Sequence, residues 1–262
     1  MDILKAIILG AIQGLTEFLP ISSSGHLMIG EALLNTKGED SLLFTILVHG
    51  ATVLSTLVVF RKDILEIFKG LFKFKWNDET KYTLKIIISM IPVAIIGLFF
   101  KDYVENLFES ESIAFIGYML LVTAALLFFA WLNNNEKNRK EVGFFNSLII
   151  GIAQAIAVIP GISRSGATIA TALLLKIDRA KAARFSFLMV IIPILGENFL
   201  DLMKGNITAA ATPTSSLIAG FITAFVVGLL ACKFMISVVT KGRLHYFAIY
   251  CAIVGLAVIL FL

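Results

Sequence analysis

The chain has 262 residues, of which 58% are hydrophobic and only 15% are charged, and its net charge is +4 at pH 7. A soluble domain carries about 25% charged residues, so this composition excludes an ordinary soluble protein. The small positive charge gives no reason to expect a nucleic-acid partner.

Six apolar runs are long enough to cross a bilayer, which takes about 20 residues as a helix. They lie at about 42–60, 82–100, 112–132, 184–203, 215–236 and 244–262. We therefore expect an all-α polytopic membrane protein with six transmembrane helices, folded as one integral membrane domain over residues 1–262.

Two further apolar segments, 3–34 and 146–177, are interrupted in the middle. The first contains "LPISSSGH" and the second contains "IPGISRSG". Irregular backbone survives in hydrocarbon only where protein buries it or where it lines a wet cavity. These segments therefore predict two re-entrant helix–loop–helix hairpins whose tips reach the membrane interior.

The two interrupted segments also repeat each other at a constant offset of 141 residues. The matching residues are Gly10, Gln13, Ser22, Ser24 and Gly25 in the first and Gly151, Gln154, Ser163, Ser165 and Gly166 in the second. We expect an internal duplication, with repeat one at about 1–135 and repeat two at about 142–262. Each half has one hairpin and three spans, an odd number, so the second repeat should be inverted.

The basic residues fall mainly on one side of this arrangement. Seventeen of the 22 Lys and Arg residues lie in the segments that would share one face, including loop 61–85, and four lie on the other. Cytoplasmic loops of membrane proteins are rich in Lys and Arg. The bias predicts that both termini lie outside, with the first hairpin entering from outside and the second from the cytoplasm.

Each hairpin tip carries one charged residue, and the two charges are opposite. Glu17 shares a helix face with Gln13 four residues earlier, but its counterpart in the second repeat is Val158. Arg164 has Ser23 as its counterpart. Ionisable residues at membrane depth are costly and are usually functional. An ion pair between Glu17 and Arg164 is the purely structural alternative.

The polar residues around these charges are typical of an anion site. The planar guanidinium of Arg164 matches a phosphate bidentately, and helix N-termini favour anions. Further hydrogen-bond donors are expected from Gln13, Ser22, Ser24, Ser163, Ser165 and Thr168. Helix capping or a bond to nearby backbone is an equally good interpretation of Ser24, Ser165 and Thr168.

Ser23 and His26 are three residues apart and would be neighbours on a helix that begins at about Ser23. Ser23 could attack phosphorus with His26 as its base, although His26 is also a candidate nucleophile. Glu17 could orient the imidazole, take a proton or hold a divalent cation. His49 is expected to be a packing residue or a supporting donor. The ensemble indicates phosphoryl transfer, with a transporter or a non-catalytic lipid-binding protein as alternatives.

The stretches "QGLTEFLPISSSGHL" at 13–27 and "PGISRSGAT" at 160–168 resemble the two signatures of the bacitracin-resistance family of undecaprenyl-diphosphate phosphatases. The resemblance implies a multi-pass enzyme of the bacterial inner membrane that removes the terminal phosphate from undecaprenyl diphosphate. This reaction recycles the lipid carrier of cell-wall synthesis and confers bacitracin resistance.

The same resemblance implies a divalent cation, Mg²⁺ or Ca²⁺, for which Glu17 is the candidate ligand, and an active site that opens to the outer face. It assigns the catalytic positions to Glu17, Ser23, His26 and Arg164. The expected partners are the polyprenyl diphosphate and membrane lipids, and a homodimer is left open.

Overall fold

The computed structural model describes residues 1–36, 41–100, 103, 112–133, 140–203 and 212–262. Within these residues the chain is helical, apart from one isolated β-bridge between Lys140 and Ile177. The helices are α1 (Ile3–Thr16), α2 (Ser23–Leu33), α3 (Ser41–Val59), α4 (Arg61–Leu71), α5 (Asp78–Phe99), α7 (Ile113–Leu132), α8 (Phe144–Ile156), α9 (Arg164–Leu174), α10 (Arg179–Met189), α11 (Ile191–Met203), α12 (Thr214–Thr240) and α13 (His245–Phe261). The predicted all-α class is confirmed.

Four helices are long and apolar enough to cross a bilayer, namely Asp78–Phe99, Ile113–Leu132, Arg179–Leu200 and Thr214–Thr240. A fifth span is possible if α3 and α4, which meet at a bend of 73°, are counted together. The sixth predicted span corresponds to α13, which has 17 residues. The chain is a multi-pass membrane protein, and the number six stays a prediction.

One predicted span is interrupted at a single residue. The segment expected at 184–203 forms α10 and α11, which are separated at Val190. Pro193 lies three residues later and has no N–H to donate to the carbonyl of Met189. The loss of that hydrogen bond explains why the helix loosens at Val190.

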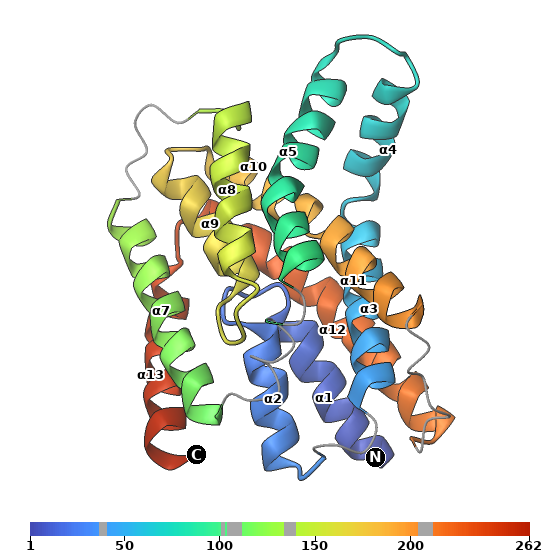
Figure 1. Cartoon of the computed structure of the whole chain (residues 1–262), viewed down its shortest axis with the longest axis vertical. Coiled ribbons are helices and arrows are strands. Elements are labelled where there is room, and N and C mark those ends of the chain that lie inside the picture. Colours follow the sequence, from blue (N-terminus) through green and yellow to red (C-terminus); the bar gives the residue numbers. More distant parts are fainter. Residues whose placement is uncertain (37–40, 101–102, 104–111, 134–139, 204–211) are drawn as a thin grey trace.

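Two helical hairpins approach each other from opposite ends of the molecule (Figure 1). The α1–α2 hairpin rises from the end that carries both termini, and α8–α9 descends from the other end. Their tips meet near the middle of the molecule, where Gly25 lies against Gly161 and Gly166 lies against Pro20. Two polar turns that are far apart in the sequence thus come together in the interior.

The repeated glycines serve the same purpose in both halves. α1 packs against α12, and α8 packs against α5. A Cβ on Gly10 would lie 2.5 Å from the carbonyl oxygen of Gly220, and one on Gly151 would lie 2.4 Å from that of Ser89. Only glycine permits backbones to approach so closely. These matching contacts agree with the proposed duplication.

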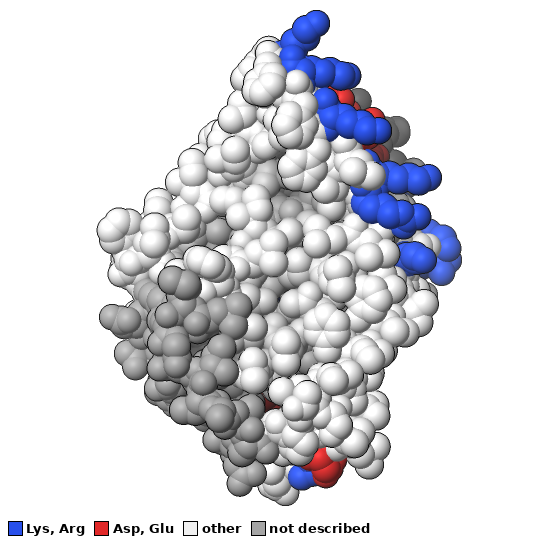
Figure 2. All heavy atoms as spheres, turned by 90° about the vertical axis from the view of Figure 1, so that its right-hand side faces the viewer, with Lys and Arg blue, Asp and Glu red and all other residues white. Residues whose placement is uncertain are grey.

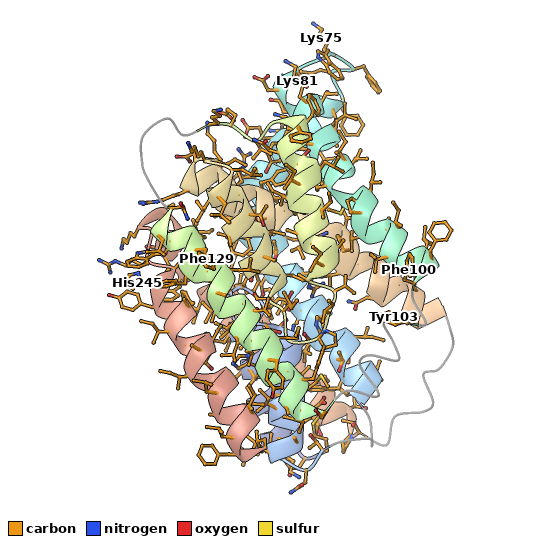
Figure 3. The ribbon with its side chains drawn as sticks, turned by 60° about the vertical axis from the view of Figure 1, so that its left-hand side comes forward. Lys75, Lys81, Phe100, Tyr103, Phe129 and His245 are labelled. Atoms are coloured by element: carbon orange, nitrogen blue, oxygen red, sulfur yellow. The ribbon has the colours of Figure 1, made fainter. Side chains whose placement is uncertain are left out.

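Charged and aromatic side chains mark different levels of the molecule. Lys and Arg gather at the α4–α5 end, whereas few charges lie at the end with the termini (Figure 2). Lys75 and Lys81 lie at the outermost part of this end (Figure 3). A cluster of rings, which includes Phe129, Trp131 and His245, lies where α7 ends and α13 begins. Such rings are typical of membrane interfaces.

Candidate active site

The second helix of each hairpin begins with a serine cap. The Ser22 hydroxyl accepts a hydrogen bond from the Gly25 N–H at 3.3 Å, and the Ser163 hydroxyl accepts one from the Gly166 N–H at 3.0 Å. These four residues are the repeated positions of the two tips. The caps start α2 and α9 at the meeting point of the hairpins, where the positive ends of the helix dipoles favour an anion.

The first tip is strained, and the second is not. Ser22 has φ 71° and ψ 99°, whereas its counterpart Ser163 has φ −75°. A side chain at positive φ costs about 1–3 kcal/mol and persists only where the surroundings enforce it. The Ser22 carbonyl lies 2.8 Å from Nδ1 of His26, a contact that helps to hold this conformation.

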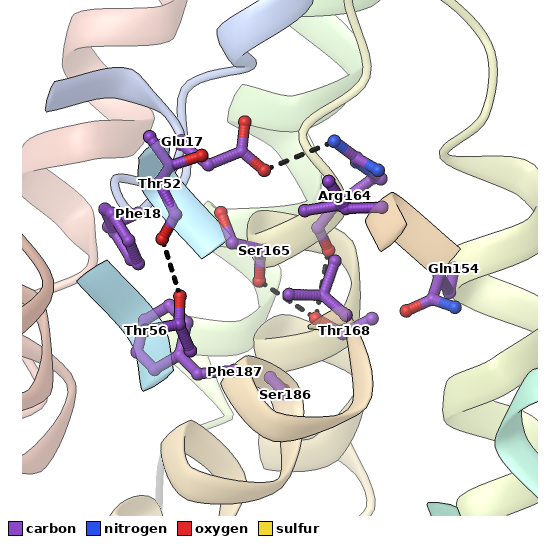
Figure 4. Close-up of a pocket in the computed structure, with 12 residues that line it drawn as sticks. Glu17, Phe18, Thr52, Thr56, Gln154, Arg164, Ser165, Thr168, Ser186 and Phe187 are labelled. Atoms are coloured by element: carbon purple, nitrogen blue, oxygen red, sulfur yellow. Dashed lines mark hydrogen bonds and ion pairs between the residues drawn. The ribbon is translucent and has the colours of Figure 1, made fainter. Parts of the chain in front are cut away.

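Glu17 connects the two tips. Its Oε1 accepts a hydrogen bond from Nη2 of Arg164 at 3.2 Å, and its Oε2 accepts one from the Ser23 hydroxyl at 2.6 Å. Gln13 also donates to Oε2, at 2.9 Å. Figure 4 shows the Glu17 carboxylate facing the Arg164 guanidinium. The Glu17 side chain is only 7% exposed. The predicted alternative of a Glu17–Arg164 ion pair is therefore present, and the Ser23 hydroxyl donates a hydrogen bond to the same carboxylate.

His26 is directed toward α13. Its Nε2 lies 2.9 Å from the hydroxyl of Tyr250, and the two rings are stacked 5.6 Å apart. Its Nδ1 is engaged with the Ser22 carbonyl. Both imidazole nitrogens are thus occupied, while the Ser23 hydroxyl bonds to Glu17. The role of His26 as the base for Ser23 stays a prediction that this geometry does not favour.

His49, which the sequence analysis treated as a packing or supporting residue, approaches the site from α3. Its Nε2 lies 4.0 Å from Oε2 of Glu17, and its Nδ1 lies 2.9 Å from the carbonyl of Thr45. After Gln13 and Arg164, it is the third nitrogen-bearing side chain beside the buried carboxylate.

The remaining predicted donors form a network within and between the tips. The Ser24 hydroxyl lies 3.5 Å from that of Ser22, and the Ser165 hydroxyl lies 3.3 Å from that of Ser163. Ser165 also donates to the Leu19 carbonyl in the first tip at 3.2 Å. The Thr168 hydroxyl bonds to carbonyls of its own helix, as the capping alternative expected. Phosphate binding by these hydroxyls stays a prediction.

A small pocket lies beside the ion pair (Figure 4). Its lining combines both hairpins with α3, α10 and α11, through Glu17, Phe18, Thr52, Thr56, Gln154, Arg164, Ser165, Thr168, Ser186, Phe187, Val190 and Ile194. The threonines of α3 had no signal in the sequence. Gln154 is the counterpart of Gln13 in the repeat, which could have pointed to it.

The fit of the site to a divalent cation rests on one carboxylate. Within the described residues, no three His, Cys, Asp or Glu side chains are grouped as metal ligands. Both oxygens of Glu17 already accept hydrogen bonds. The described residues alone therefore do not group into a metal site, and a cation beside Glu17 would need phosphate oxygens as its main ligands.

Known proteins are similar to this chain over nearly its whole length. A model of the family described as "Bacitracin resistance protein BacA" matches residues 6–257. A protein of Christiangramia forsetii named undecaprenyl-diphosphatase is 58% identical over 264 residues, which cover 100% of this chain and 98% of that protein. Proteins with the same name are 59% identical in Bacteroides thetaiotaomicron, over 99% of both chains, and 40% identical in Korarchaeum cryptofilum, again over 99% of both. The chain therefore belongs to the BacA family of bacitracin resistance proteins.

Proposed function

We propose that this chain is an integral membrane phosphatase that hydrolyses undecaprenyl diphosphate to undecaprenyl phosphate and inorganic phosphate. The reaction recycles the lipid carrier of cell-wall synthesis and thereby confers bacitracin resistance. The observation that carries the proposal is the contact of Ser23 and Arg164 with the two oxygens of one buried carboxylate, Glu17. The name shared by the full-length relatives supports the same substrate.

Arg164 and the two helix N-termini hold the terminal phosphate. The Arg164 side chain is 22% exposed, so its guanidinium can reach an incoming anion while it stays paired with Glu17. Arginine binds phosphate through two parallel N–H groups, and the starts of α2 and α9 add backbone donors. The phosphate therefore lies between the tips, within reach of the Ser23 hydroxyl.

Glu17 acts as the general base and Ser23 as the nucleophile. The Ser23 proton passes to Oε2 of Glu17, 2.6 Å away, as the oxygen attacks the terminal phosphorus. An O–P bond forms at Ser23, the bond from that phosphorus to the bridging oxygen breaks, and undecaprenyl phosphate leaves. Glu17 passes the proton to the departing phosphate oxygen and then takes a proton from the water that attacks the phosphoserine. That proton returns to the Ser23 oxygen as its bond to phosphorus breaks, so that inorganic phosphate is released and the Ser23 hydroxyl and the Glu17 carboxylate are regenerated. Arg164 stabilises the charge on the transferred group.

His26 acts on the shape of the tip. Its contact with the strained Ser22 carbonyl fixes the backbone that places Ser23 beside Glu17. A direct attack by His26 would first require its ring nitrogens to leave Ser22 and Tyr250. The geometry therefore favours Ser23 as the nucleophile.

A divalent cation, Mg²⁺ or Ca²⁺, fits the proposal as a group that arrives with the diphosphate. Glu17 is the protein residue that would contact it, and when bound it would neutralise phosphate charge. Removal of the cation should then weaken substrate capture.

The proposed topology has six spans, an inverted repeat and two re-entrant hairpins, with both termini and the active-site opening on the outer face of the inner membrane. The opposed hairpins and the basic α4–α5 end support this arrangement (Figures 1 and 2). The diphosphate can then enter between the tips while the prenyl tail stays in lipid. A homodimer is a separate proposal, which light scattering of the purified protein tests.

The function is tested by phosphate release from undecaprenyl diphosphate with purified protein. The wild type should release phosphate, and the double variant Ser23→Ala, Arg164→Ala should not. A wild type that binds the lipid without releasing phosphate would instead support the transporter or lipid-binding alternative.

A further inference from the structure

The pocket beside Arg164 contains a glutamine whose amide has no protein partner. Gln154 on α8 is only 1% exposed, yet neither its Nε2 nor its Oε1 has a hydrogen-bond partner among the residues that the structure describes. Buried polar groups in native proteins are nearly always paired, so each exception requires an explanation. The Gln154 side chain lines the same pocket as Arg164 and Thr168 (Figure 4).

The repeat explains how Gln154 lost its partner. In the first hairpin, the amide of Gln13 donates to the carboxylate of Glu17, one helical turn later. In the second hairpin, Gln154 occupies the position of Gln13, but the position of Glu17 is Val158. The second repeat thus has the amide donor but not the acceptor, which in the first hairpin is a carboxylate.

A second unpaired group lines this part of the pocket. Ser186 on α10 is 3% exposed, and its hydroxyl has no hydrogen-bond partner within the described part of the chain. Polar groups from α8 and α10 are therefore unpaired around one pocket that already contains a guanidinium. This combination is what a bound oxyanion would satisfy.

We propose that Gln154 is a binding residue for the reacting phosphate, whose oxygen accepts from Nε2 the hydrogen bond that Glu17 accepts in the first hairpin. Ser186 adds a second neutral donor from α10. The assignment rests on the proposed phosphatase function, and it extends the phosphate site from the two tips to the wall formed by α8 and α10. Neutral donors suit this wall because they bind the anion without repelling Arg164.

The test compares Gln154→Met and Gln154→Glu with the wild type, with inorganic phosphate as the probe. Phosphate affinity is measured directly by calorimetry in detergent, and the apparent Tm is measured without phosphate. Ser147→Ala is the control, because Ser147 is buried on the same helix two turns earlier, with its hydroxyl bonded to the Phe144 carbonyl.

Gln154→Met should weaken phosphate binding about tenfold or more, since a hydrogen bond to a charged group is lost. The same variant should keep or raise the Tm of the free protein, because it removes an unpaired buried amide at nearly constant volume. Gln154→Glu should abolish phosphate binding, since it places a second carboxylate beside the anion. Ser147→Ala should leave phosphate affinity unchanged.

The inference fails if Gln154→Met binds phosphate within twofold of the wild type, or if the wild type binds no phosphate. It also fails if Gln154→Met lowers the Tm and leaves affinity unchanged, as for a purely structural residue. Because binding is measured without turnover, a protein that binds phosphate through Gln154 but hydrolyses no diphosphate would refute the phosphatase proposal alone.

Discussion

Replacing Glu17 by Gln tests the centre of the site, because it removes a charge and keeps the size of the side chain. The variant leaves the Arg164 guanidinium without its carboxylate and the Ser23 hydroxyl without its proton acceptor. The same substitution should therefore affect both stability and catalysis, by different amounts.

The stability cost follows from the burial of the pair. Removing one partner of a buried ion pair costs about 3–5 kcal/mol. Arg164 is 22% exposed and keeps some access to solvent, so we expect about 3 kcal/mol, the lower end of that range. For a protein of this size the apparent Tm should fall by about 6–12 °C. Inorganic phosphate should restore part of this loss, because it gives Arg164 a new anionic partner.

The catalytic cost follows from the loss of the base. Removal of a general base lowers the rate by about 10²–10⁴-fold, so kcat for undecaprenyl diphosphate should fall by this factor. The KM should change much less than kcat, since Arg164 is still present to bind phosphate. The matched variant Arg164→Gln should instead raise the KM. The reasoning is refuted if Glu17→Gln keeps kcat within fivefold of the wild type, or if its main effect is on KM.

Three further predictions concern the strained tip, the helix packing and the orientation. His26→Asn should keep activity within about tenfold of the wild type, because the asparagine amide can still donate to the Ser22 carbonyl. His26→Ala should lose more activity, because the strained backbone of Ser22, which stores about 1–3 kcal/mol, can then relax. Equal inactivity in both variants would mean that the imidazole itself reacts. Gly151→Ala should destabilise the protein by about 1–3 kcal/mol in thermal unfolding, since the new Cβ would lie 2.4 Å from a backbone oxygen of α5. The control is Gly97→Ala, whose Cβ would meet nothing within 4 Å and which should be neutral or stabilising in the same measurement. Lys73→Cys should react with an impermeant maleimide only after cells are permeabilised, and labelling of intact cells would reverse the proposed orientation.

The hairpins could be predicted from the sequence because their causes are local. Proline combined with glycine and a capping serine favours a helix end, so the breaks near Pro20 and Pro160 were visible in the chain, whereas Pro92 alone does not end α5. α2 begins at Ser23, as predicted. The meeting of the two tips could also be anticipated, since the constant offset of 141 residues and the odd number of spans suggested opposed hairpins.

The partner of Ser23 could not be predicted, because it depends on one backbone angle. Spacing alone made His26 the natural base. Ser22, however, takes a φ of 71°, and His26 then bonds to its carbonyl and to Tyr250, while Ser23 bonds to Glu17. Residue spacing on a regular helix does not predict a positive φ at the preceding residue.

The pocket-lining residues of α3 and α10 also could not be predicted from the sequence. Thr52 and Thr56 reach the site from α3, and Ser186 reaches it from α10. Polar residues of this kind in a membrane helix usually bond to their own backbone, and both threonines do so. Their place beside Arg164 follows from the packing of distant helices.

The most direct test of the account is to trap the phosphoryl group during turnover. Undecaprenyl diphosphate labelled with ³²P in its terminal phosphate is mixed with the purified enzyme and quenched after milliseconds with denaturing detergent at neutral pH, where both phosphoserine and phosphohistidine survive, and the labelled peptide is identified by mass spectrometry. The account predicts label on Ser23 in the wild type and none in Ser23→Ala. Label on His26, or inversion at a chiral thiophosphate with no labelled peptide, would contradict it.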